Sequence, residues 1–306
     1  MQTRRLGSLN VSLIGLGTNN FGYFMEADAV GPVVDAAIDA GINFFDTSDS
    51  YLESEVRLAD ALGSRRDRVL IATKFASPID GGLGGASAQY VKEACERSLR
   101  RLRTDHIDLY QIHRPDTDTP ISETLGALNE LVRAGKVREI GCSNFSAEQI
   151  REARDAVAGG DAHFVSVQNQ WNLLQREDED NAVSECGKQK MSYLPYFPLA
   201  SGMLTGKYER GVDPPSGTRL NKVGGGQGLR SERNFDILDT LSAWSAERGH
   251  TVLDLAFAWL SSHDVVASVI AGATTAEQVL LNVAAAEWKL SEAERRDVAN
   301  LAPAVG

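Results

Sequence analysis

The chain has 306 residues, 42% of them hydrophobic, and its 31 basic and 42 acidic residues give a formal net charge of −11. This negative balance disfavours non-specific binding to nucleic acid or to anionic membranes. No apolar run is long enough to span a bilayer, and the N-terminus has no apolar signal segment. The three cysteines, Cys95, Cys142 and Cys186, are far apart and have no metal-ligand spacing. They predict free thiols, no metal site and a cytoplasmic location.

Short apolar runs alternate with helical patterns along the chain, after a small hairpin expected within residues 4–12. The eight candidate strands are Leu13–Gly17, Asn43–Asp46, Val69–Thr73, Ile107–Ile112, Val137–Cys142, Phe164–Gln168, Ser192–Tyr196 and Val266–Ile270. Between them, apolar residues recur at helical spacing, as in residues 87–102. Capping-box pairs open two of the expected helices: Ser146 with Gln149, and Thr275 with Gln278.

Eight strands alternating with helices predict an α/β fold, a (β/α)₈ barrel formed by residues 1–306 as a single domain. A doubly wound open sheet is the alternative, because alternation alone does not separate the two folds. Residues 209–233 are rich in Gly and Pro and lack apolar periodicity, so we expect a long loop after the seventh strand. A loop of this length in a compact domain is typical of a lid or a mobile surface segment.

Three consecutive candidate strands end on ionisable residues: Asp46, Lys74 and His113. In a barrel the carboxyl ends of all strands meet at one face, where the active sites of barrel enzymes lie. Tyr51 follows Asp46 closely in the next loop. Each residue alone has a simpler explanation, such as helix capping, snorkelling to solvent or an ordinary edge histidine. Together, the four predict one catalytic site at this face.

The four side chains support acid–base chemistry on a carbonyl group. A free tyrosine has a pKa of about 10, and a neighbouring lysine ammonium should lower the Tyr51 pKa. Asp46 should pair with Lys74 and keep its ammonium charged, while a neutral His113 can donate a hydrogen bond to a carbonyl oxygen. Such a set can protonate a forming alkoxide. Because no side chain supplies a hydride, reduction would require a cofactor.

Seven segments carry a resemblance to the aldo-keto reductase family across nearly the whole chain, in the family's order: FFDTSDSY, IATKF, LYQIHRPD, GCSNF, VQNQWNL, PYFPLASGMLTGKY and GATTAEQVLLN. The chain is most similar to bacterial members that also resemble potassium-channel β subunits. This resemblance implies a (β/α)₈ barrel that reduces small-molecule aldehydes or ketones with NADPH. From the charge and the lack of a long apolar run, we expect no nucleic-acid or membrane partner. It implies a tetrad of Asp46, Tyr51, Lys74 and His113, in which Tyr51 donates the proton.

The resemblance also implies a set of cofactor contacts. These are Gly17, Thr18, Asn19, Asp46, Ser143, Asn144, Gln168, Tyr196, Phe197, Pro198, Leu199, Ser201, Gly202, Lys207, Arg219, Gly272, Thr274, Gln278 and Asn282. Many relatives carry a cation in the segment that matches residues 272–278, and this chain has none there, so NADH is the alternative to NADPH. Trp171 and Phe21 are expected either at the substrate mouth or in ordinary packing. A cofactor-sensing regulatory protein with slow turnover is the alternative function, and the sequence names neither the substrate nor the oligomeric state.

Overall fold

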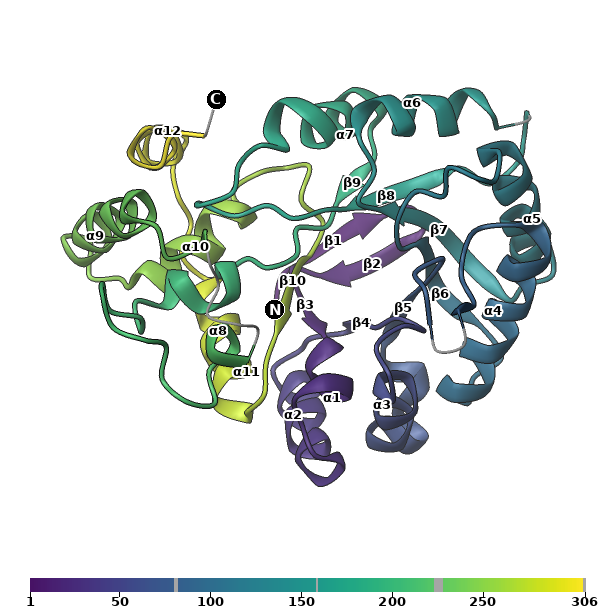
Figure 1. Ribbon diagram of the computed structural model, residues 1–306, viewed down its shortest axis with the longest axis horizontal. Helices are drawn as coiled ribbons and strands as arrows, with labels where there is room; N and C mark the ends of the chain where they lie inside the picture. Colours follow the sequence, from purple (N-terminus) through teal and green to yellow (C-terminus); the bar gives the residue numbers. More distant parts are fainter. Residues whose placement is uncertain (80–81, 158, 223–227, 305–306) are drawn as a thin grey trace.

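The computed structural model describes residues 1–79, 82–157, 159–222 and 228–304. Within these ranges, eight parallel strands form one sheet in the order β10-β3-β4-β5-β6-β7-β8-β9 (Figure 1). The strands are β3 (Ile14–Gly17), β4 (Phe44–Asp46), β5 (Leu70–Phe75), β6 (Ile107–Ile112), β7 (Val137–Ser143), β8 (Phe164–Gln168), β9 (Ser192–Tyr193) and β10 (Val269–Gly272). Isolated bridges from Tyr193 to Val266 and from Tyr196 to Ile270 join the two ends of the sheet. The predicted (β/α)₈ barrel is confirmed.

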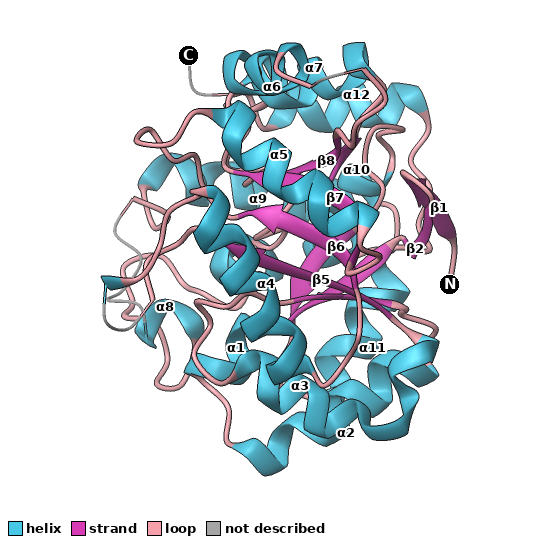
Figure 2. Cartoon of the chain, turned by 90° about the vertical axis from the view of Figure 1, so that its right-hand side faces the viewer, coloured by secondary structure: helices cyan, strands magenta, loops and turns pink. Residues whose placement is uncertain are grey.

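Helices cover the outside of the barrel (Figures 1 and 2). They are α1 (Asn19–Tyr23), α2 (Ala27–Asp39), α3 (Ser54–Leu62), α4 (Ala88–Leu102), α5 (Ile121–Arg133), α6 (Ala147–Asp155), α7 (Ser184–Gln189), α8 (Arg219–Lys222), α9 (Glu232–Ala246), α10 (Val252–Ser261), α11 (Ala276–Ala285) and α12 (Glu292–Leu301). The Ser146–Gln149 capping box is present at the start of α6. Thr275 caps α11 by accepting from the Gln278 N–H, but the Gln278 side chain accepts from the Thr274 N–H, so the expected reciprocal box does not form.

The expected N-terminal hairpin, β1 (Thr3–Leu6) and β2 (Leu9–Ser12), closes the amino-terminal end of the barrel. Leu6, Leu9 and Val11 pack in one buried cluster with inward-facing strand residues, including Phe44 and Leu109. Figure 2 shows the hairpin at one end of the barrel and α8 with its neighbouring loops at the other. Among the described residues, the barrel therefore opens toward the carboxyl ends of its strands, where barrel active sites lie.

Two of the predicted strands differ from the observed ones by three residues at one end, whereas the other six agree to within two residues at each end. β9 ends at Tyr193 rather than Tyr196, because Pro195 has no N–H to donate to a continuing ladder. β10 begins at Val269, three residues later than expected, and ends at Gly272, two residues later than expected. Both expected segments still touch through the isolated bridges, and the Ile270 N–H donates to the Pro195 carbonyl. Apolar residues occur throughout both predicted segments, residues 192–196 and 266–270. The apolar pattern alone therefore did not show where the hydrogen-bonded strand pairing begins and ends.

The region predicted as one long loop, residues 209–233, contains the short helix α8, and α9 begins before the region ends. Residues 223–227, which hold most of its glycine-rich stretch, lie outside the described residues. The three cysteines are buried and free, as predicted. In the part of the chain that the structure describes, no helix is both long and apolar enough to cross a membrane.

Candidate active site

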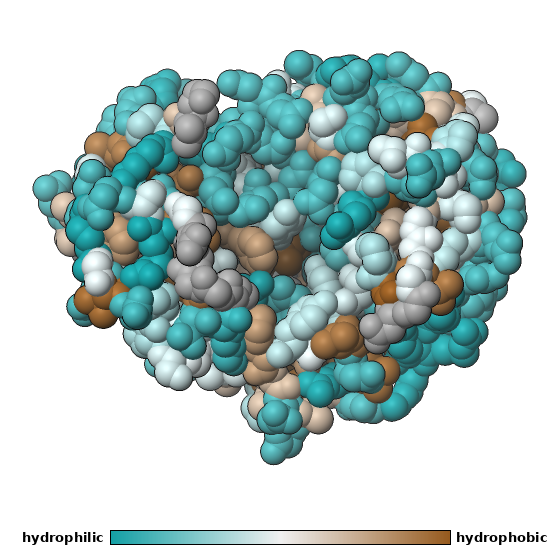
Figure 3. All heavy atoms as spheres, viewed as in Figure 1, coloured by the Kyte–Doolittle hydropathy of each residue, from teal (hydrophilic) through white to brown (hydrophobic). Residues whose placement is uncertain are grey.

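A cavity of about 1040 Å³ opens at the carboxyl ends of the strands. The face drawn in Figure 3 is hollowed near its centre, and apolar residues form the floor of the hollow. Cavities that hold small molecules and cofactors usually have volumes of roughly 300–1,000 Å³. This cavity is therefore at the upper end of the range and has room for a large ligand.

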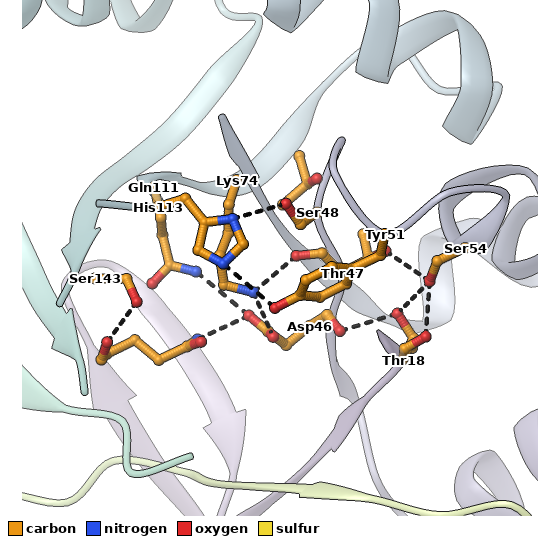
Figure 4. A network of polar contacts seen from close by, with 12 residues as sticks. Thr18, Asp46, Thr47, Ser48, Tyr51, Ser54, Lys74, Gln111, His113 and Ser143 are labelled. Atoms are coloured by element: carbon orange, nitrogen blue, oxygen red, sulfur yellow. Dashed lines mark hydrogen bonds and ion pairs between the residues drawn. The ribbon is translucent and has the colours of Figure 1, made fainter. Parts of the chain in front are cut away.

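Asp46 and Lys74 form a buried ion pair at the base of the cavity (Figure 4). Lys74 Nζ lies 2.6 Å from Asp46 Oδ2 and 2.8 Å from the Thr47 carbonyl oxygen, and the lysine side chain has no solvent exposure. Asp46 Oδ1 also accepts a hydrogen bond from Gln168 Nε2, at 2.8 Å. The carboxylate at the end of β4 is thus stabilised by the lysine and by an amide, as the pairing argument predicted.

Tyr51 and His113 face each other beside this pair. The Tyr51 hydroxyl lies 3.5 Å from His113 Nε2, and Lys74 Nζ lies 5.0 Å from the centre of the Tyr51 ring. Burial and the positive charges of Lys74 and Arg114 lower the His113 pKa to about 2, so the imidazole is neutral at physiological pH. A neutral imidazole can donate one hydrogen bond, and the adjacent phenol can supply a proton.

The expectation that the Tyr51 pKa lies below its usual value is wrong for the protein without ligands. Burial raises this pKa, the Lys74 charge lowers it, and the effect of burial is the larger. Asp46 contributes a further increase, because its negative charge opposes the phenolate. Burial lowers the Lys74 pKa, but Asp46 and Tyr51 together raise it by more, so the Lys74 pKa lies above its usual value and the side chain stays charged. The site therefore contains a neutral phenol beside a charged lysine.

The structure brings the sequence-predicted site residues together around the one cavity. All of them line it except Lys74, which lies behind Asp46. Gly17, Thr18 and Asn19 come from the end of β3, whereas Gly272, Thr274, Gln278 and Asn282 come from β10 and α11. Phe197, Pro198, Leu199, Ser201, Gly202, Lys207 and Arg219 lie on the segment after β9. The cavity is thus bordered by residues far apart in the sequence, which only barrel closure brings together.

Amide and hydroxyl groups follow β7 and β8 along one wall of the cavity. The Ser143 hydroxyl donates to the Gln168 carbonyl oxygen at 2.6 Å, and Asn144 Nδ2 donates to the His113 carbonyl oxygen at 2.8 Å. The Tyr196 hydroxyl donates to Asn144 Oδ1 at 2.8 Å, which fixes the phenol ring across the cavity. This wall presents a planar ring and polar groups, which suit a ligand that has both an aromatic ring and an amide.

The segment after β9 adopts an unusual backbone that suits an anion. Phe197, Ala200 and Ser201 have positive φ angles of 53°, 45° and 56°, and Gly202 follows with φ 95°. A Cβ atom on Gly202 would lie 2.9 Å from Lys207 Cε, so a larger residue here would displace the end of the lysine side chain. Close backbone approach next to a cation is the arrangement that phosphate groups need. The cavity therefore fits a cofactor with an amide-bearing ring and phosphates.

Several cavity residues were missed by the sequence analysis. They are Asn20, Phe24, Arg114, Thr205, Gly217, Thr218, Lys222, Leu253, Ile270, Ala271 and Leu281. Arg114 could have been found, because it directly follows His113 at a strand end. Trp171 and Phe21 do not line the cavity: both are fully buried, and Trp171 packs against Trp259. Of the two expectations for Trp171 and Phe21, the substrate mouth or ordinary packing, ordinary packing is therefore the correct one.

A barrel with this acid–base cluster at its mouth and a cavity fit for a nucleotide defines a class of enzyme, the cofactor-dependent barrel oxidoreductases. Residues 13–302 match the Aldo/keto reductase family, and the chain belongs to this family. The chain is thus an oxidoreductase of a family that uses nicotinamide cofactors on small-molecule carbonyl compounds.

Proteins similar to this chain include enzymes and one uncharacterised relative. An uncharacterised oxidoreductase of Bacillus subtilis is 32% identical over 97% of this chain and 94% of its own length. The L-glyceraldehyde 3-phosphate reductase of Escherichia coli K12 is 30% identical over 93% of this chain and 87% of its own length. The holo form of an aldo-keto reductase from Bacillus halodurans superposes with a TM-score of 0.83, at 31% identity, covering 100% of this chain and 97% of the other.

Proposed function

We propose that this protein reduces aldehydes or ketones to alcohols with NADPH, and that Tyr51 donates the proton to the substrate oxygen. The observation that supports this most strongly is the Tyr51 hydroxyl, which faces His113 Nε2 at 3.5 Å and lies beside the buried Lys74–Asp46 pair. When bound, the nicotinamide supplies the hydride. Tyr51 holds the proton that completes the alcohol, the neutral His113 donates a hydrogen bond to the carbonyl oxygen, and the Lys74 ammonium stabilises the negative charge that forms on the phenol oxygen as Tyr51 gives up its proton.

The cavity residues divide between the two ends of such a cofactor. Ser143, Asn144 and Gln168 would hold the carboxamide, and Tyr196 would stack on the nicotinamide ring. Lys207 and Arg219 would neutralise the phosphates, and Arg219 is positioned by its hydrogen bond to Asn20 Oδ1 and by the ring of Phe197, 4.9 Å away. Gly272, Thr274, Gln278 and Asn282 would surround the adenosine end.

The test is to incubate the protein with NADPH and each member of a panel of aldehydes and ketones. Turnover is measured as the decrease in nicotinamide absorbance. The panel includes an anionic aldehyde, because Arg114 lines the cavity next to His113 and one relative is a reductase of a phosphorylated aldehyde. We expect steady turnover of at least one compound, and less with His113→Gln. Tight NADPH binding without turnover of any compound would instead support a cofactor-sensing regulatory protein.

A further inference from the structure

A group of buried polar side chains lies next to the tetrad, between β4, α3 and α4. At its centre is Asp49, which is 3% exposed and is held by the hydrogen bond from its N–H to the Lys74 carbonyl oxygen. The titratable and charged groups that face it are Glu55 on α3, Tyr90, Arg97 and Arg101 on α4, and Tyr110 on β6. The proposed reaction assigns no role to any of them.

Asp49 is poised to change its protonation state. Burial raises its pKa, the negative charge of Glu55 raises it further, and Arg101 and Arg97 offset only part of this, so the pKa is about 7. Asp49 Oδ2 has no hydrogen-bond partner among the described residues. Asp49 Oδ1 accepts a hydrogen bond from the Ser48 hydroxyl, at 3.4 Å.

Ser48 connects Asp49 to the tetrad. Its hydroxyl oxygen lies 3.0 Å from His113 Nδ1 (Figure 4). The same oxygen lies 3.0 Å from the Ser50 hydroxyl and accepts from the Ser50 N–H at 3.3 Å. The hydroxyl has one hydrogen to donate. An ionised Asp49 competes with His113 for that hydrogen, because a bond to a charged acceptor is the stronger. A neutral Asp49 competes much less.

The two outcomes differ in where His113 carries its single ring proton. If Ser48 donates to Nδ1, the proton must be on Nε2, the nitrogen that faces Tyr51. If Ser48 donates to the Asp49 carboxylate, Nδ1–H can donate to the Ser48 oxygen, and Nε2 then has only a lone pair. Only the first form can donate a hydrogen bond to a substrate oxygen beside Tyr51.

We propose that Asp49 is a positioning residue, which selects the tautomer of His113 through the Ser48 hydroxyl. Neutral Asp49 favours the Nε2–H form and ionised Asp49 favours the Nδ1–H form. The inference rests on the proposed carbonyl reduction for its catalytic consequence, since Nε2–H is the hydrogen-bond donor in that reaction. The tautomer itself can be measured without turnover.

Nitrogen-15 NMR of the imidazole nitrogens tests the proposal directly, with the His113 signal identified by its loss in His113→Gln. Between about pH 5 and about pH 9, we expect the wild-type His113 to change from Nε2–H to Nδ1–H, with a midpoint near the Asp49 pKa of about 7. In Asp49→Asn, which cannot ionise, the Nε2–H form should persist at every pH. A wild-type His113 signal that does not change with pH, or that changes equally in Asp49→Asn, overturns the proposal.

Two serine variants form a matched pair that tests whether the Ser48 hydroxyl connects Asp49 to His113. Ser48→Ala removes the hydroxyl that touches both Asp49 and His113, so the pH dependence of the tautomer should be lost. Ser50→Ala removes a hydroxyl that lies 3.3 Å from His113 Nδ1 and, within the described part of the chain, makes no hydrogen bond to the Asp49 carboxylate, so the pH dependence should remain. Equal behaviour of the two variants contradicts a connection through Ser48. Circular dichroism checks that each variant is folded.

The catalytic consequence is a fall in kcat as the pH rises. We expect kcat of the wild type to fall roughly 10- to 100-fold between about pH 6 and about pH 9, and kcat of Asp49→Asn to remain nearly constant. A pH profile of Asp49→Asn identical to that of the wild type contradicts the proposal. If the wild type reduces no carbonyl compound, the proposed function fails, and the NMR measurement still decides whether Asp49 sets the His113 tautomer.

Discussion

At the residue scale, the most informative feature is the ion pair between Asp46 and Lys74. A buried ion pair usually contributes little net stability compared with well-packed apolar side chains, because both charges lose their hydration. Here the lysine has no solvent exposure, and the aspartate needs an amide donor from Gln168 as well. The pair is therefore explained better by the positive charge that it holds next to Tyr51 than by stability.

Replacing Lys74 with Met tests the pairing. The variant should lose activity and also roughly 3–5 kcal/mol of unfolding free energy, because Asp46 is left charged and buried without its ionic partner. Adding Asp46→Asn should restore part of that stability and none of the activity. Urea unfolding curves measure both effects, and a double variant no more stable than Lys74→Met would contradict the pairing argument.

Tyr51→Phe removes the proposed proton donor and changes little else in the cavity. We expect kcat for carbonyl reduction to fall by roughly 10²–10⁴, the contribution of a general acid. The dissociation constant of NADPH, measured by fluorescence quenching, should stay close to that of the wild type. Wild-type turnover in this variant would remove Tyr51 from the mechanism.

At the element scale, the segment after β9 is the part of the cavity that depends most on backbone conformation. Gly202 and Gly206 both have positive φ angles, 95° and 74°, so alanine at either position should cost about 1 kcal/mol of stability. At Gly202 a Cβ would also displace Lys207, whereas at Gly206 the nearest contact, with Val252, is an ordinary 3.7 Å.

The two alanine variants therefore separate stability from binding. Gly202→Ala should weaken NADPH binding by roughly tenfold, because Lys207 must move away from the proposed phosphate site. Gly206→Ala should lose similar stability and bind NADPH nearly as well as the wild type. Titration calorimetry and thermal unfolding measure the two quantities, and equal affinities for NADPH would show that Lys207 is not held by this close approach.

Helix α11 is the element proposed to meet the adenosine end of the cofactor. Its first turn offers N–H groups and the positive end of the helix dipole, which favour an anion. Thr275 does not line the cavity, and its hydroxyl caps the helix, so an arginine there would remove the cap. Leu281 lines the cavity and is 50% exposed, which makes it the better position for an added cation.

Leu281→Arg should raise the ratio of kcat/KM with NADPH to kcat/KM with NADH by roughly 3- to 10-fold at low ionic strength. Leu280→Arg is the matched control, because Leu280 is similarly exposed, at 55%, on the same helix but does not line the cavity. Both ratios are measured at one fixed salt concentration. An equal change in the two variants would show that the effect is not local to the cofactor site.

At the scale of the whole molecule, the sequence predicted the barrel and the composition of its mouth because both depend on local patterns. Strand ends such as Asp46 and Lys74 are visible in the sequence, and the parallel barrel then brings them to one face. The positive φ angles after β9 and the contact of Ser48 with His113 were not predictable, because they depend on how distant loops pack. The Tyr51 pKa was misjudged for the same reason: its direction depends on burial, which the sequence does not show.

The central claim is that this barrel transfers a hydride from a nicotinamide to a carbonyl carbon. The most direct measurement uses NADPH with deuterium at the transferable position of the ring, and mass spectrometry of the alcohol formed from a carbonyl substrate. We predict one deuterium per alcohol molecule, bound to carbon, for each NADPH that is oxidised, and much slower formation of the same product by Tyr51→Phe. Alcohol without deuterium, or deuterated alcohol formed equally fast by Tyr51→Phe, would contradict the account.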